Sequence, residues 1–264
     1  MCMRVTNLSS GSKGNCSIVV GQHTNVLIDI GIGIRLLESS LQQVGLKTQD
    51  IGAILITHEH TDHICGLECF AKKYPDVHVF VYAEVWEAIT RKHNALNKLK
   101  NVHKFAYDTM FSVGEFSCVA MNNFHDSISC ASFILAQNNS RVGFCTDLGI
   151  ITDYQVDMLS TCKVVFLESN HDKEMLKNCA YPYILKQRIG GNNGHLSNEQ
   201  CAVAALKMVQ NKTKVIVLSH ISENSNLPEK AYSHIADVFE QNHIKNVHIL
   251  LSYPKKVGKT ITIL

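Results

Sequence analysis

Short apolar runs separated by polar and glycine-containing turns recur along the chain. In the first half these runs predict strands at Arg4–Leu8, Cys16–Val20, Asn25–Ile30, Ala53–Thr57 and Val77–Tyr82. In the second half they predict strands at Phe116–Asn122, Cys130–Ala136, Arg141–Thr146, Val164–Glu168, Lys214–Ser219 and Val247–Ser252. Apolar residues three and four positions apart predict helices at Ile34–Val44, Ile64–Lys73, Glu84–Leu99, Asn198–Gln210 and Pro228–Gln241.

One of these helices carries a clear start signal. Ser197 precedes Asn198–Gln210 as a candidate N-cap, and Gln200 follows three residues later, as in a capping box. The order of elements, with strands first, then strand–helix units, and then the same mixture again, predicts two packed sheets covered by helices. A length of 264 residues without a low-complexity linker suits a single domain, 1–264.

The amino-acid composition bears mainly on the cellular compartment of the protein. The net charge of +2 does not by itself indicate a nucleic-acid-binding protein. The ten cysteines lie mostly inside apolar runs and form no CxxC pair, so buried free thiols and a reducing cytoplasm are expected. The first residues, MCMRVTNLSSGSKG, lack the apolar core of a signal peptide, and no apolar run reaches the roughly 20 residues of a membrane span.

The segment THEHTDH is the most informative stretch of chemistry. His58, His60, Asp62 and His63 follow directly on the buried strand ILI. Strand ends are where α/β folds place ligands. Neutral imidazoles and carboxylates suit divalent metals, and four such groups cannot be desolvated together without a cation. A solvated polar loop is the competing interpretation, and we favour a metal site.

Further ligands are expected at other strand ends. His125 follows the strand Phe116–Asn122, Asp147 follows Arg141–Thr146 and His220 lies just beyond the apolar run Lys214–Leu218. Each residue alone would more often be a capped or solvated side chain. Together with the first cluster they are enough for two metal ions.

These residues, in this order, resemble the metallo-β-lactamase superfamily over most of the chain. The resemblance implies a four-layer αβ/βα sandwich with a dinuclear site at the sheet edges. It implies that His58, His60 and His125 hold one metal, that Asp62, His63 and His220 hold the other, and that Asp147 bridges them. The identity of the two divalent ions, Zn, Mn or Fe, stays open.

Four shorter motifs narrow the resemblance. SSGSKGNCS, LESNHD, GHLSNEQ and LSHISENSN are similar to the YycJ/WalJ group, bacterial proteins described as DNA exonucleases. The surroundings of His195 and His220 also resemble the ribonuclease Z type. True β-lactamases with a cysteine ligand fit poorly, because Asp147 stands at that position and Cys145 belongs to the strand.

The resemblance and the chemistry together predict a phosphodiesterase that acts on nucleic acid, expected to be DNA. Two metals can share a hydroxide and clamp a phosphoryl oxygen, with Asp62 as general base. His195 is the candidate for protonating the leaving group or binding the phosphate, and capping of its helix is the alternative. Ser197 and Asn170 are further candidates for substrate binding. Glu168 and Asn170 could orient His195 or a metal ligand, and His171 is expected on the surface.

Three other functions stay open from the sequence. A small-molecule hydrolase of the same fold, for a thioester, a lactone or a cyclic phosphodiester, would share the metal ligands. A non-enzymatic metal-binding protein is disfavoured by the intact ligand set, since degenerate scaffolds usually lose ligands. A di-iron redox protein is disfavoured because no flavin-binding extension is present.

Overall fold

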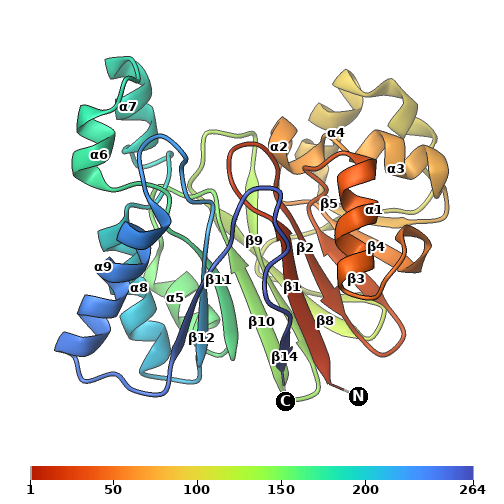
Figure 1. Ribbon diagram of the computed structural model, residues 1–264. Coiled ribbons are helices and arrows are strands. Elements are labelled where there is room, and N and C mark those ends of the chain that lie inside the picture. Colours follow the sequence, from red (N-terminus) through yellow and green to blue (C-terminus); the bar gives the residue numbers. More distant parts are fainter. Residues whose placement is uncertain (1, 264) are drawn as a thin grey trace.

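Two seven-stranded sheets form the centre of the computed structural model, which describes residues 2–263 (Figure 1). The strand order in the first sheet is β14 (Ile261–Ile263), β1 (Met3–Ser9), β2 (Cys16–Val20), β3 (Asn25–Ile28), β4 (Ile51–Leu55), β5 (His78–Tyr82) and β6 (Val102–Phe105). The order in the second sheet is β13 (His248–Leu251), β12 (Val215–Ser219), β11 (Val164–Glu168), β10 (Ser140–Cys145), β9 (Cys130–Gln137), β8 (Phe116–Asn123) and β7 (Met110–Val113). In each sheet one side is antiparallel and the other parallel, and the change occurs at β3 and at β10.

Helices lie on the outer side of each sheet (Figure 1). On the first sheet these are α1 (Ile34–Gln43), α2 (Thr61–Ile64), α3 (Leu67–Lys73) and α4 (Ala83–Lys92), with short 3₁₀ turns at Thr48–Asp50 and Asn94–Lys98. On the second they are α5 (Asp153–Leu159), α8 (Asn198–Val209) and α9 (Pro228–Gln241), while α6 (Lys173–Asn178) and α7 (Tyr183–Ile189) stand beyond the strand ends. Within residues 2–263, no helix has the length and apolar character needed to cross a membrane.

Three apolar cores lie between these four layers. The central core lies between the sheets and contains Val5 and Phe80 from the first and Phe133 and Phe166 from the second. Two outer cores join each sheet to its helices. Each fully buried side chain of this size contributes about 1.5–3 kcal/mol of transfer free energy. The helix–sheet–sheet–helix order confirms the predicted four-layer αβ/βα sandwich.

Most predicted elements are present, and two predicted helices are interrupted. The expected helix Ile64–Lys73 is instead the end of α2 followed by α3, because the chain closes onto the first sheet at Gly66. The Gly66 N–H donates to the Ile30 carbonyl oxygen, and a side chain at position 66 would collide with the Ile32 carbonyl oxygen. The expected helix Glu84–Leu99 ends at Lys92 and continues only as a 3₁₀ turn.

The elements that the sequence pattern did not predict are short or exposed. They are the edge strands β6, β7 and β14 and the helices α5, α6 and α7. Helix α7 has only seven residues and buries none of them, so it lacks the long core-facing stripe from which a helix is predicted.

Candidate metal centre

The first sheet supplies one group of polar side chains from the end of β4. His58 and His60 follow that strand, and His60 is the N-cap of α2. The single turn of α2 then carries Asp62 and His63 back toward the strand end. Gly31 permits this turn, because a side chain at that position would collide with the backbone of Asp62.

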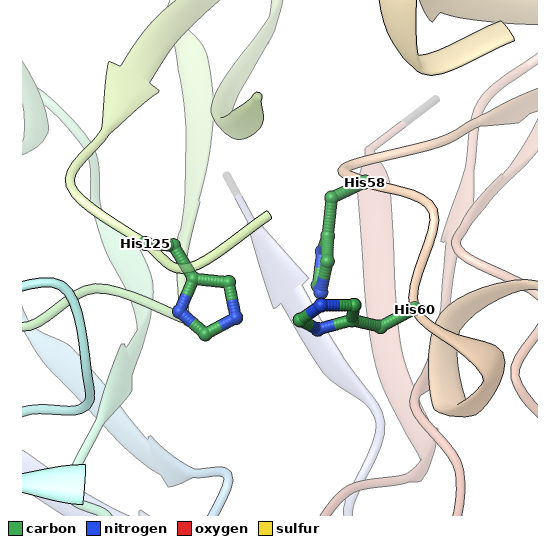
Figure 2. A group of neighbouring side chains, drawn as sticks. All are labelled: His58, His60 and His125. Atoms are coloured by element: carbon green, nitrogen blue, oxygen red, sulfur yellow. The ribbon is translucent and has the colours of Figure 1, made fainter. Parts of the chain in front are cut away.

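The second sheet supplies the opposing group. His125 follows β8, Asp147 follows β10 and His220 follows β12. Figure 2 shows the His125 ring reaching from one loop toward the rings of His58 and His60 on the other side. The sheet edges therefore bring together side chains that are up to 162 positions apart in the sequence (His58 to His220).

All seven predicted ligands converge at this edge. The donor atoms lie within 4.8 Å of one another in each of four groups: His58, His60 and His125; His58, His63 and Asp147; Asp62, His63 and His220; and Asp147, Glu168, His195 and His220. Asp147, His58, His63 and His220 each belong to two of these groups, so the four groups form one continuous cluster.

Unpartnered buried atoms show that the donor set suits a divalent cation. Within the described residues, His58 Nε2, His220 Nε2 and Asp147 Oδ2 are buried and have no hydrogen-bond partner. Leaving a buried polar atom unpaired costs about 1–3 kcal/mol. Imidazole nitrogens and carboxylate oxygens are preferred ligands of Zn, Mn and Fe, and a metal would satisfy all three atoms.

The opposite ring nitrogens of the histidines are already held by the protein. His63 Nδ1 lies 2.7 Å from Asp29 Oδ2, and His125 Nδ1 donates to the Gly194 carbonyl at 3.2 Å. His58 Nδ1 lies 3.0 Å from the Thr57 hydroxyl. Such outer contacts fix ring orientation and tautomer, which leaves Nε2 of His58 and His125 for a metal, while Nε2 of His63 also lies 3.0 Å from the Asn15 amide nitrogen.

The charges of the cluster differ from one histidine to the next. Burial alone would lower the pKa of His63, but the carboxylates of Asp147, Asp29 and Asp62 outweigh burial and raise this pKa well above its usual value. His58 is also fully buried. Burial, followed by the neighbouring imidazoles, lowers the pKa of His58 well below 6.5, so this ring is neutral and ready to act as a ligand.

Three residues of the site have an unusual backbone conformation. Asp29, Asp147 and His220 have φ values of 59°, 63° and 55°, in the left-handed region. A non-glycine residue held there costs about 1–3 kcal/mol, and such strain gathers at functional sites. The sharp turn that results points each side chain inward as the chain leaves its strand.

Glu168 organises the second-sheet side of the site. It is the last residue of β11 and is completely buried. Its Oε1 atom lies 2.9 Å from His195 Nδ1 and 3.0 Å from His220 Nδ1. Despite burial, the neighbouring His195 and His220 keep the pKa of this carboxyl well below its usual range. Glu168 therefore orients His195 and His220, a predicted metal ligand, which is the role that the sequence left open for it.

Asn170 and Ser197 lie close to the site but are engaged elsewhere. The Asn170 side-chain amide donates to the His220 carbonyl at 2.8 Å. Ser197 is completely buried, and its hydroxyl accepts from the Gln200 N–H as the N-cap of α8. Neither residue lines the cavity at the metal centre.

The expectation that His171 lies on the surface is wrong. Only 3% of its area is exposed, and its Nδ1 atom has no hydrogen-bond partner among residues 2–263. The isolated bridge between His171 and Ser197 holds the segment after β11 against the start of α8, which covers the ring.

A cavity of about 260 Å³ opens at the metal centre. Besides predicted residues, its lining includes Tyr181, Leu185 and Arg188 from α7 and the turn before it. Arg188 forms an ion pair with Asp126, the residue after His125. No role in the centre was predicted for these residues or for Asp29. For Asp29 a signal exists, namely a lone carboxylate at the end of the apolar run NVLIDI.

A four-layer fold with imidazole and carboxylate donors at its strand ends defines a class, the metal-dependent hydrolases. The chain belongs to the beta-lactamase superfamily, because the family model described as "Beta-lactamase superfamily domain" matches residues 24–221.

Comparison with individual proteins agrees with this family. The chain is 32% identical over 247 residues to exodeoxyribonuclease YycJ of Bacillus anthracis, covering 91% of this chain and 90% of that protein. It is also 32% identical over 228 residues to exodeoxyribonuclease WalJ of Streptococcus pneumoniae serotype 2 (strain D39 / NCTC 7466), covering 85% and 84%. The resemblance to the YycJ/WalJ group is thereby confirmed.

A solved structure shares the fold at lower identity. The metallo-beta-lactamase fold protein YhfI from Bacillus subtilis superposes with a TM-score of 0.73 at 14% identity, covering 98% of both chains.

Proposed function

We propose that this protein is a DNA exonuclease that hydrolyses phosphodiester bonds with two divalent metal ions. The convergence of His, Asp and Glu donors at one cavity carries the hydrolytic part of this proposal. The DNA part is supported by the two relatives named exodeoxyribonucleases, each 32% identical over at least 84% of both chains.

The ligand groups suggest how two ions would be held. We assign His58, His60 and His125 to one ion, and Asp62, His63 and His220 to the other. Asp147 would contact both, because it shares donor groups with residues of each set. Two such ions supply Lewis-acid polarisation of a phosphoryl oxygen and activation of water at neutral pH.

The chain's own residues would then handle protons. Asp62 is 24% exposed in its side chain toward the cavity, and its Oδ2 atom lies 3.5 Å from His63 Nε2. Burial alone would raise the pKa of this carboxyl, but the neighbouring His63 and His220 outweigh burial and hold the pKa well below its usual range, so Asp62 stays ionised and can accept a hydrogen bond from water. This is the position of a group that orients the nucleophile and accepts its proton.

His195 would act at the leaving group. Its Nδ1–H is held by Glu168, which leaves Nε2 as the nitrogen available to the cavity that His195 lines. From this position Nε2 can donate a hydrogen bond to a departing alkoxide or to a phosphate oxygen. For Asn170 and Ser197 we propose supporting roles, at His220 and at the start of α8, in place of direct substrate contact.

The organisation and location of the protein follow the same reasoning. Because both sheets contribute ligands, we propose that residues 1–264 work as one domain. The ten free cysteines of the described chain support a reducing, cytoplasmic environment.

End-labelled DNA tests the proposal directly. Metal-stripped protein reloaded with Mn or Zn is incubated with single- and double-stranded DNA, with Asp147→Asn as the inactive control. Release of labelled mononucleotides or short ends only by the metal-loaded wild-type protein is the expected result. Intact DNA under both metals, with turnover of a thioester, a lactone or a cyclic nucleotide instead, would contradict the DNA proposal.

A further inference from the structure

Helix α7 lines two cavities. Leu185, Arg188 and Ile189 border the cavity of the metal centre. Tyr183, Lys186 and Gln187 border a second and larger cavity of about 610 Å³, which also touches α6 and the start of α8. Since α7 has seven residues and a length of about 10 Å, the two cavities are close neighbours.

The second cavity is basic. Lys173, Lys177 and Lys186 line it, and none of its lining residues is acidic. Lys186 Nζ donates to the Lys177 backbone carbonyl at 2.7 Å, which holds the Lys186 ammonium group against the end of α6. Lys173 has only a distant ion-pair partner, Glu199 at 3.9 Å. A cluster of lysines without carboxylates in the same cavity suits a phosphate backbone.

The same cavity has an exposed aromatic ring. Tyr183 is 73% exposed, and its hydroxyl accepts a hydrogen bond of 2.8 Å from the Gln187 amide on the next turn. This bond holds the ring along α7. Because α7 buries none of its residues, the ring adds nothing to the core, and its open face can stack on a nucleobase.

We propose that this second cavity, named here the α7 cavity, binds single-stranded DNA a few nucleotides from the phosphate that is cleaved. Tyr183 would stack on a base, while Lys177 and Lys186 contact phosphates. The inference rests on the proposed nuclease function. The DNA strand would then contact both sides of α7, with Arg188 on the side that faces the metal centre.

Length-dependent binding tests this inference. Fluorescence anisotropy measures the affinity of the metal-loaded protein for phosphorothioate oligodeoxynucleotides of two to twelve nucleotides. Tyr183→Ala and the double variant Lys177→Gln/Lys186→Gln are compared with Tyr232→Ala and Lys212→Gln. The control tyrosine lies on α9 and the control lysine after α8, and neither borders the α7 cavity.

The expected result is a loss that grows with length. Tyr183→Ala should weaken binding of the longer oligonucleotides about tenfold, as removal of one stacking platform does. The double lysine variant should also reduce the slope of log affinity against log salt by about 1.4, or about 0.7 for each phosphate contact. In cleavage assays the KM for long substrates should rise more than kcat falls.

Two other results separate this inference from the proposed function. If wild-type protein degrades DNA but both α7 variants bind every length as the controls do, the α7 cavity is overturned and the nuclease proposal stands. If the length-dependent losses appear but no DNA is cleaved, the cavity is upheld as a DNA site and the nuclease proposal fails.

Discussion

His58 and His63 are five residues apart and both completely buried, yet they are supported differently. The Nδ1 atom of His58 meets a hydroxyl and a thiol, from Thr57 and Cys130. The Nδ1 atom of His63 meets the carboxylate of Asp29. The first belongs to the three-histidine group (His58, His60 and His125), and the second to the carboxylate-supported group (Asp62, His63 and His220).

The same contrast holds for the other members of each group. His125 is held by a backbone carbonyl, whereas His220 is held by Glu168. A carboxylate partner makes an imidazole a more basic ligand than a neutral partner does. The two groups therefore differ in donor types as well as in ligand strength, and we expect two inequivalent metal sites.

The largest effect should come from Asp147, whose donor atoms lie within 4.8 Å of those of His58 and His63 and of those of His195 and His220. Asp147→Asn keeps the size of the side chain, and asparagine tolerates the left-handed backbone at this position. Both metals should bind more weakly, and cleavage should fall by more than the 10–100-fold that loss of an outer ligand partner costs. Metal content and DNA cleavage are the measurements. An unchanged circular dichroism spectrum serves as the control, and near-normal metal content would contradict a shared role.

A smaller and one-sided effect is expected at Asp29. Asp29→Asn removes the charge behind His63 while the amide oxygen can still accept from the Thr57 N–H. The metal of the carboxylate-supported group should bind roughly 10–100-fold more weakly. Chelator competition followed for each metal equivalent measures the change. Equal weakening of both equivalents would show that the two groups do not act separately.

A matched substitution beside the three-histidine group, Cys130→Ala, should weaken metal binding less than Asp29→Asn does. Cys130→Ala removes the thiol that lies 3.7 Å from His58 Nδ1, while the Thr57 hydroxyl remains at 3.0 Å. Loss of one weak neutral contact is worth about 1 kcal/mol, which is roughly a fivefold change in affinity. The same chelator competition should show this change in the three-histidine group alone. A larger loss than that of Asp29→Asn would reverse the comparison.

The seven proposed ligands could be picked out from the sequence because all of them obey one local rule. Each lies directly after an apolar strand or in the short turn that follows, so a linear pattern was enough. The partners Asp29 and Glu168 also lie at strand ends, but which ligand each contacts depends on the tertiary structure. Glu168 contacts His220 because β11 pairs with β12, and it contacts His195 because the segment before α8 lies at the end of β11.

The misses in the fold have a related cause. Helix α7 has no buried face, and β14 has only three residues and pairs with β1 from the other end of the sequence. His171 follows a strand end as the ligands do, so nothing local marks it as buried. Its burial comes from the contact with the segment before α8.

The smallest predicted effect compares His171 with His220. Both are 3% exposed. Burial lowers the pKa of His171 to about 4, whereas the carboxylates of Asp147, Asp62 and Glu168 outweigh burial at His220 and raise its pKa. Below pH 6.5 the unfolded chain protonates His171 and the folded chain does not, so His171 costs stability as the pH falls toward 4.

Denaturant unfolding at pH 7.5 and 5.5 measures this cost. Wild-type protein should lose about 1 kcal/mol more than His171→Asn does over that interval. The variant shares all other titrating groups, so the difference isolates His171. Identical pH dependence of the two proteins would show that the ring is protonated in the folded state.

The central claim is that two unequal metal sites share Asp147, and metal titration tests it most directly. Calorimetric titration of metal-free wild-type protein with Zn or Mn is compared with that of Asp29→Asn and Asp147→Asn. If two unequal sites share Asp147, two binding steps per chain are expected, one of them weakened by Asp29→Asn and both weakened by Asp147→Asn. A single metal per chain, or two steps that shift equally in Asp29→Asn, would contradict it.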